Sequence, residues 1–281
     1  MEKDLIGRGV LCGAIAGLLS FVFSRVFAEP YVQKAIDYEA GRDAAQALLD
    51  KSAGLPAESD LFTRTVQADV GMGVGMIAFG IGMGALFALV YAVCLGRVGR
   101  LRPRPLALLV AAAGFLGLYL VPFLRYPANP PAVGLADTIR QRTGMYLVMV
   151  LSSVALLALA VWLGQRLRAR FGNWNASLLA GAAFVVAIGT VMALLPSFGQ
   201  PATGRFAATA SETPLPLTDA NGAISYPGFP ADVLFYFRLY SVAGQLLLWS
   251  AIGLLFAPMA DRLLGQAAGA ANRSGAAAAQ A

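Results

Sequence analysis

Histidine is absent from this 281-residue sequence, and charged residues make up only 13% of it. Without histidine, the usual Ser-His and Cys-His nucleophile pairs cannot form. The sequence also lacks the GxxxxGK[ST] phosphate-binding loop, the HExxH zinc-protease motif and the GxSxG nucleophile elbow. These absences argue against an enzyme, and any ATP hydrolysis would have to come from another protein.

Cysteine is rare as well, because Cys12 and Cys94 are the only two. Both fall inside long apolar stretches, which predicts small packing residues and not a disulfide framework. The middle of each apolar stretch also lacks Asp, Glu and Lys. Proton relays and buried metal sites within a membrane usually depend on such groups. Metal chemistry is therefore expected at the ends of the stretches or on a partner.

Apolar residues, in contrast, are in excess: they make up 58% of the chain, and its mean hydropathy is +0.67. A soluble fold of this length cannot bury so much apolar surface. A helix of about 20 apolar residues crosses a hydrocarbon core of roughly 30 Å. We therefore predict an all-α polytopic membrane protein with about six transmembrane helices. The predicted spans are 5–28, 70–95, 106–124, 144–164, 177–196 and 239–257.

Arginines are clustered after the second and the fourth predicted span. The positive-inside rule places both of these turns in the cytoplasm, and alternation then places both termini there. With this topology the cytoplasmic side carries eleven bases and three acids, and the outer loops carry nine bases and twelve acids. We predict a multi-pass protein of the bacterial inner membrane with an acidic outer face. The clustered arginines are Arg97, Arg100, Arg102, Arg104, Arg166, Arg168 and Arg170.

Three outer loops follow from this topology, at 29–69, 125–143 and 197–238, and the first and last are long. Pro30 and the alanine-rich composition of 31–51 predict a helix in the first loop, and Asp60 is a candidate cap for a further helix that leads into the second span. Dense proline and glycine predict turns and extended segments in the last loop. Residues 1–263 are expected to form one bundle, and 264–281 a disordered cytoplasmic tail.

The first span also allows a second interpretation, because Val26-Phe27-Ala28 resembles a small-residue cleavage site at the end of a signal peptide. Two acids precede the apolar run, and Arg25 interrupts it. These charges favour an uncleaved span over a signal peptide.

The second predicted span is rich in glycine, and some of its glycines are four residues apart. This small-xxx-small spacing lets helix backbones approach closely, so we predict a helix-packing face. Met72, Met76 and Met83 lie on roughly one side of the same helix, either as flexible apolar filler or as a path for a soft metal ion. The glycines are Gly71, Gly73, Gly75, Gly80, Gly82 and Gly84.

The most distinctive segment is 125–134, which reads RYPANPPAVG. Three prolines fix φ and remove three amide donors, so we expect a rigid extended loop with free carbonyls that lines a mouth or contacts a neighbour. This segment, followed by a span that starts with Arg142 and Thr143, resembles the signature of the CbtA family of predicted cobalt transporter subunits. Pro30 after Glu29, the Tyr38-Glu39 pair, the stretch 229–232 and the last span (Phe237, Arg238, Ser241, Gln245, Trp249) are similar to that family in the same order.

This resemblance implies a membrane subunit of a cobalt uptake system associated with cobalamin synthesis. It also implies a small single-span partner, CbtB, with a histidine-rich end. Members of the family are often described with five spans, so both five and six stay open, and the loop 197–223 is longer than the family pattern. The expected metal contacts for transported Co2+ are Glu29, Glu39, Asp69 and Asn129, and no permanently bound cofactor is expected.

Two other functions fit the same sequence. One is a non-transporting membrane scaffold, whose outer loops bind a partner and whose glycine-rich helix packs against it. The other is a permease for an organic solute, although the absence of charge in mid-membrane speaks against an ion-coupled version.

Overall fold

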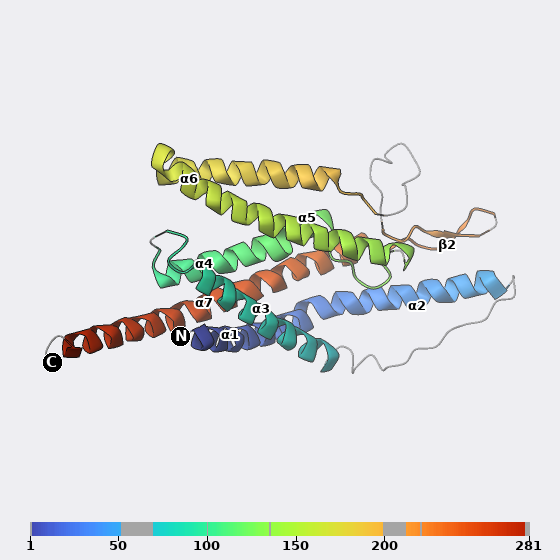
Figure 1. The fold of residues 1–281 in the computed structure, drawn as a ribbon. Coiled ribbons are helices and arrows are strands. Elements are labelled where there is room, and N and C mark those ends of the chain that lie inside the picture. Colours follow the sequence, from blue (N-terminus) through green and yellow to red (C-terminus); the bar gives the residue numbers. More distant parts are fainter. Residues whose placement is uncertain are drawn as a thin grey trace.

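Helices make up most of the computed structural model, which describes residues 2–51, 70–99, 101–134, 136–198, 212–219 and 221–278 (Figure 1). The only sheet in these residues is a two-stranded hairpin. The elements are α1 (Glu2–Phe23), η1 (Ser24–Ala28), α2 (Glu29–Lys51), α3 (Met72–Cys94), α4 (Pro103–Gly114), η3 (Phe115–Leu120), α5 (Val121–Arg125), η4 (Ala136–Thr138), α6 (Ile139–Leu194), β1 (Leu217–Thr218), β2 (Ile224–Tyr226) and α7 (Ala231–Ala278).

Five helical stretches in the described residues are long and apolar enough to cross a membrane. One of them, α6, consists of two helices that meet at Gly172, whose φ of 72° reverses the chain. Figure 1 shows its two arms running side by side, and each arm contains one predicted span. The chain is thus an all-helical membrane protein, and the number of crossings stays a prediction. The five stretches are Glu2–Leu49, Met72–Cys94, Pro103–Arg125, Ile139–Leu194 and Ala231–Gly265.

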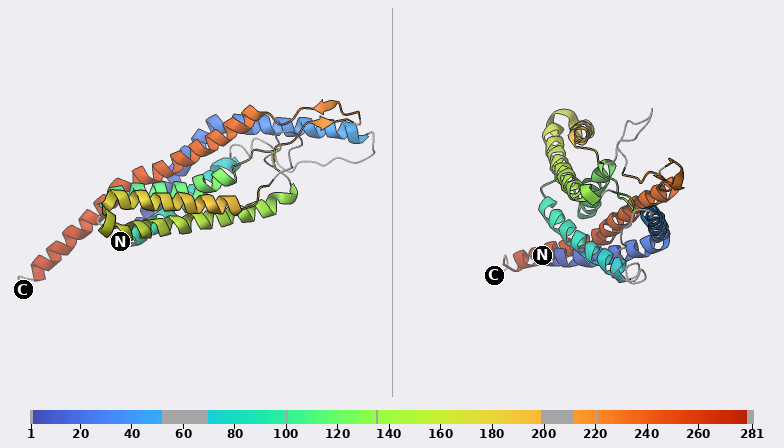
Figure 2. Two further views of the ribbon diagram at one scale, coloured as in Figure 1. Left: turned by 90° about the horizontal axis from the view of Figure 1, so that it is seen from above. Right: turned by 90° about the vertical axis from the view of Figure 1, so that its right-hand side faces the viewer.

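The arginine-rich turns and both termini lie toward one end of the bundle, at the left of Figure 1. We call this the arginine end. The proline-rich loop, the hairpin and the far end of α2 lie at the opposite end, which we call the loop end. Both ends are also visible in the left view of Figure 2. This arrangement agrees with an even number of passes between the termini, and the assignment of the arginine end to the cytoplasm stays a prediction.

Two π-helical segments widen the helices just before a proline. η1 ends where the Glu29 amide donates to the Ser24 carbonyl, and η3 ends where the Val121 amide donates to Leu116. Pro30 and Pro122 follow immediately. A proline ring collides with the carbonyl four residues earlier, and i→i+5 bonding relieves that collision. Because of η1, the first span continues without a break into α2, which confirms the helix predicted for 31–51.

Helices α1 and α3 pack with their backbones in contact through glycines. A Cβ on Gly13 would overlap the Gly80 carbonyl oxygen, and a Cβ on Gly84 would overlap that of Gly9. In contrast, Gly75 and Gly82 have no neighbouring atom within 4 Å of a Cβ placed there. The predicted packing face is therefore confirmed for Gly80 and Gly84, and its partner is α1 of the same chain.

Aromatic residues of α3 and α7, packed against aliphatic residues of α4, form the main core. The Phe256 ring lies 5.0 Å from those of Phe87 and Tyr91, edge to face. The indole of Trp249 fills the space above Gly114, where a Cβ would collide with it. These contacts hold α7 between α1 and α4. Helix α6 is packed least. Only 11% of its most apolar 18-residue segment is buried inside the protein, compared with 28–39% of the corresponding segment in each of the other four stretches.

The C-terminal region differs from its prediction. Helix α7 continues to Ala278, well past residue 264, where composition favoured disorder. Alanine has the highest helix propensity of all residues, so an alanine-rich tail is able to extend a helix that is already nucleated.

Candidate functional site

The proline-rich loop is tied down at the loop end by two arginines from neighbouring helices. The Arg142 guanidinium of α6 donates to the Pro127 carbonyl. From α7, Arg238 Nε donates to the Ala128 carbonyl at 3.2 Å, and its Nη2 donates to Asn129 Oδ1 at 2.9 Å. These carbonyls were expected to be free, and that expectation was wrong. Prolines removed the local donors, and distant arginines replaced them.

Glu212 joins the same network from the last loop. Its Oε2 accepts a hydrogen bond from Asn129 Nδ2 at 2.7 Å and forms an ion pair with Arg142 Nη1 at 2.8 Å. Its backbone carbonyl accepts from the Gly134 amide at 3.1 Å. The side chains of Arg142 and Glu212 are only 20% and 12% exposed. We call the four residues Asn129, Arg142, Glu212 and Arg238 the loop clasp.

One carboxylate oxygen of the clasp has no hydrogen-bond partner among the described residues. This oxygen, Glu212 Oε1, is buried. Next to it, Ala132 has a φ of 67°, a left-handed conformation that costs about 1 kcal/mol or more outside glycine. The turn from the Val133 amide to the Pro130 carbonyl, at 3.2 Å, holds this conformation. The loop is thus bonded to its own chain, and its rigidity stays a prediction.

Two cavities adjoin the clasp, with volumes of about 320 and 440 Å3. Both are lined by Glu39 and Glu212, and by the backbone around Ala132 and Gly134. The first is also lined by Arg142, and the second by Asp43 and Arg42. The loop end therefore has a polar, charged hollow between α2, the proline-rich loop and the segment that precedes β1.

A small apolar cluster holds α2 against this hollow. Tyr38, Val133, Phe229 and Val233 are buried together around Ala35. The Tyr38 hydroxyl donates to the Pro227 carbonyl at 3.0 Å, and its ring meets that of Phe229 edge to face at 4.9 Å. Segments that are far apart in the sequence, including the Tyr38-Glu39 pair, the proline-rich loop and the stretch 229–232, therefore meet at one place.

These segments are the ones whose sequences resemble a known family, and the family model described as "Probable cobalt transporter subunit (CbtA)" matches residues 2–261. The chain belongs to the CbtA family. This is a family of transporter subunits and not of enzymes, and a subunit implies partner chains. Comparisons with curated proteins and with solved structures found no match.

The three expected metal contacts that the structure describes, Glu29, Glu39 and Asn129, do not come together in this CbtA chain. Glu29 and Glu39 are ten residues apart on α2, which separates them by about 15 Å along the helix axis. Glu29 is buried, at 7% exposed, whereas Glu39 is exposed beside both cavities. Asn129 uses both ends of its amide in the clasp. Asp69 and the candidate cap Asp60 lie outside the described residues.

In the part of the chain that the structure describes, no three His, Cys, Asp or Glu side chains are arranged to hold a metal ion. Of the three methionines of α3, Met83 packs against the main core. Sequence reasoning missed Glu212 altogether. It lies in the last predicted outer loop, where the rarity of acids is the one signal that could have found it.

Proposed function

We propose that this chain is the integral membrane subunit of a cobalt uptake system in a bacterial inner membrane, working with a small histidine-bearing membrane partner. The observation that carries the proposal is the CbtA match over residues 2–261, nearly the whole chain. The absence of histidine supports a partner, because imidazole is a preferred ligand of divalent cobalt and this chain has none to offer.

The hollow at the loop end is the best candidate for first contact with the ion. Of the three predicted residues that the structure describes, Glu39 is the one that is exposed and lines both cavities. Asp43, one helical turn further along α2, lines the larger cavity. Carboxylates at the mouth of a cleft raise the local concentration of cations. In this proposal Glu39 attracts the ion from the outer side, and the clasp keeps the mouth in shape.

The proposed role of Glu39 predicts a specific transport defect. Glu39→Gln removes one carboxylate from the hollow, and we expect it to raise severalfold the cobalt concentration needed for half-maximal uptake. Asp37→Asn is the matched control, since Asp37 lies on the same helix, is exposed and accepts a hydrogen bond from Gln33. Cobalt taken up by cells is measured by mass spectrometry over a range of external concentrations. Equal curves for the two variants would exclude Glu39 as a contact.

The alternative function is a non-transporting membrane scaffold. The sparse packing of α6 favours it, because most of this helix pair is left for contact with lipid or another chain. A scaffold predicts a stable complex on purification together with normal cobalt uptake after deletion of the gene. The uptake proposal predicts the loss of uptake in the same strain.

A further inference from the structure

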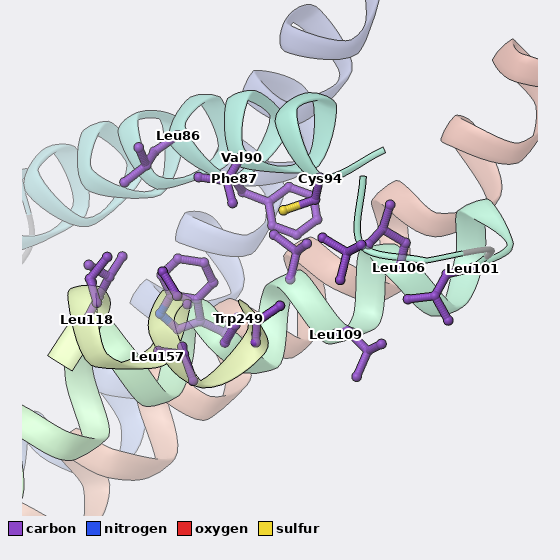
Figure 3. Close-up of a pocket in the computed structure, with 17 residues that line it drawn as sticks. Leu86, Phe87, Val90, Cys94, Leu101, Leu106, Leu109, Leu118, Leu157 and Trp249 are labelled. Atoms are coloured by element: carbon purple, nitrogen blue, oxygen red, sulfur yellow. The ribbon is translucent and has the colours of Figure 1, made fainter. Parts of the chain in front are cut away.

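An apolar groove lies between α3, α4, η3 and the first arm of α6. Its volume is about 450 Å3, within the range of small-molecule sites. Figure 3 shows side chains of α3 projecting across it toward Leu157 of α6 and Trp249 of α7. The residues that line it are all apolar apart from the Cys94 thiol and the indole N–H of Trp249. Such a space excludes water and needs an apolar occupant to recover dispersion contacts.

The groove continues into a second, partly polar cavity at the arginine end. This second cavity has a volume of about 520 Å3 and shares Val98, Leu101 and Val161 with the groove. Arg168 lines it, together with polar residues of α6. An apolar slot with a basic mouth has the shape and polarity of a phospholipid, with its acyl chain and its phosphate.

Arg168 is positioned for an acidic acceptor that the described residues do not provide. Its Nε donates to Asn173 Oδ1 at 2.7 Å, which fixes the plane of the guanidinium. At Gly99, which has a φ of 80°, a Cβ would lie 2.9 Å from Arg168 Nη1, so glycine makes room for the guanidinium beside the turn between α3 and α4. No carboxylate in the described residues pairs with Arg168.

The surroundings of this mouth carry charge of one sign. The two turns, residues 95–105 and 164–176, contain seven arginines and no acid. Among the described arginines of these turns, Arg104 forms an ion pair, with Asp261. Basic pockets between transmembrane helices bind anionic lipid head groups.

We propose that the groove holds an anionic phospholipid, with one acyl chain in the apolar part and the phosphate on Arg168. The seven arginines around the mouth favour an anionic head group over an apolar partner helix as the occupant.

Trp249 provides a fluorescent probe inside the groove. Trp162→Phe and Trp174→Phe leave it as the only tryptophan of the chain. The full-length protein is reconstituted in vesicles that contain equal fractions of phosphatidylglycerol or phosphatidylcholine with brominated acyl chains, which quench a nearby indole. We expect stronger quenching by brominated phosphatidylglycerol. Arg168→Gln should reduce this preference about fivefold, the effect of one arginine on an anionic lipid.

Matched variants separate the groove from the general surface. Ala158 lines the groove, so Ala158→Phe should weaken quenching by both lipids, whereas Ala183→Phe on the exposed side of the other α6 arm should not. Arg170→Gln, at an arginine stacked on Phe171, should leave the lipid preference unchanged. Equal quenching by the two lipids would overturn the proposal, as would the absence of any quenching, which indicates a protein occupant. Loss of the preference in the presence of inorganic phosphate would also overturn it, by assigning the mouth to the free anion.

Discussion

Replacing Gly80 by leucine is expected to separate α1 from α3 and to lower the free energy of unfolding by about 3 kcal/mol, the upper end of the usual cost of overpacking. A Cβ at this position would overlap the Gly13 carbonyl oxygen and would lie 2.8 Å from Gly17 Cα. Both are backbone atoms, so no side-chain rotation relieves the collision. Lipid is as apolar as the helices, and close backbone contact is what holds such a pair together.

The matched control is Gly82→Leu, two residues further along the same helix. No atom lies within 4 Å of a Cβ at Gly82, so the added side chain extends into open space. Thermal unfolding in detergent measures stability, and maleimide labelling of Cys12 measures separation of the helices. Cys12 is only 1% exposed, and a Cys94→Ser background makes it the sole thiol. Similar unfolding temperatures and labelling rates for the two variants would show that α1 and α3 do not pack as described.

Removing Arg142 from the loop clasp is expected to have the second large effect. Arg142→Gln leaves the Glu212 carboxylate largely buried, with Asn129 as its remaining side-chain partner and with one oxygen already unpaired. Breaking a buried ion pair from one side costs about 3–5 kcal/mol. Because the two side chains keep 20% and 12% exposure, we expect the lower end of this range. We expect the lowered stability to appear first as detachment of the segment 212–219 from the proline-rich loop.

The exposed ion pair at the other end of the bundle is the control for this prediction. Arg104 Nε lies 2.8 Å from Asp261 Oδ2, with 61% and 40% of the two side chains exposed. Such surface pairs contribute less than about 1 kcal/mol, so Arg104→Gln should change stability little. Amide hydrogen exchange across 212–219, together with thermal unfolding, compares the two variants. Equal protection of the segment in both would mean that Arg142 does not hold the loop.

Local sequence patterns predicted the helices well, because the formation of each helix depends mainly on residues that are close together in the sequence. The apolar runs marked the membrane-spanning stretches, and the spacing of Gly80 and Gly84 marked a packing face. The same reasoning anticipated the helix at 31–51 and the turns of the last loop. It did not anticipate the continuous path from α1 through η1 into α2, because the π segment depends on how one proline is accommodated within an already formed helix.

The candidate site was harder to predict, because its contacts are long-range. Nothing near the proline-rich loop indicates that its carbonyls bind Arg142 and Arg238, or that Glu212 closes the network from a loop about 80 residues away. Glu29 and Asn129 are acceptable cobalt ligands by residue type, but one is buried in α2 and the other is used by the clasp. Residue type suggested the chemistry, and tertiary contacts decided which groups are available for it.

The family segments therefore have a structural meaning in this chain. Tyr38 and Phe229 pack α2 against the loop end, the proline-rich loop supplies the carbonyls, and Arg238 connects that loop to α7. Together they build a shaped hollow with Glu39 at its edge. The proposed function uses this hollow as an entry site and assigns imidazole ligation to a partner.

The most direct test is cobalt accumulation, under cobalt limitation, in a strain that lacks both this gene and the gene of the proposed histidine-bearing partner. The strain is complemented with this chain alone, with the histidine-bearing partner alone, or with both. We predict that uptake returns only when both chains are present. Unchanged cobalt uptake in the deletion strain would contradict the assignment of this chain to cobalt transport.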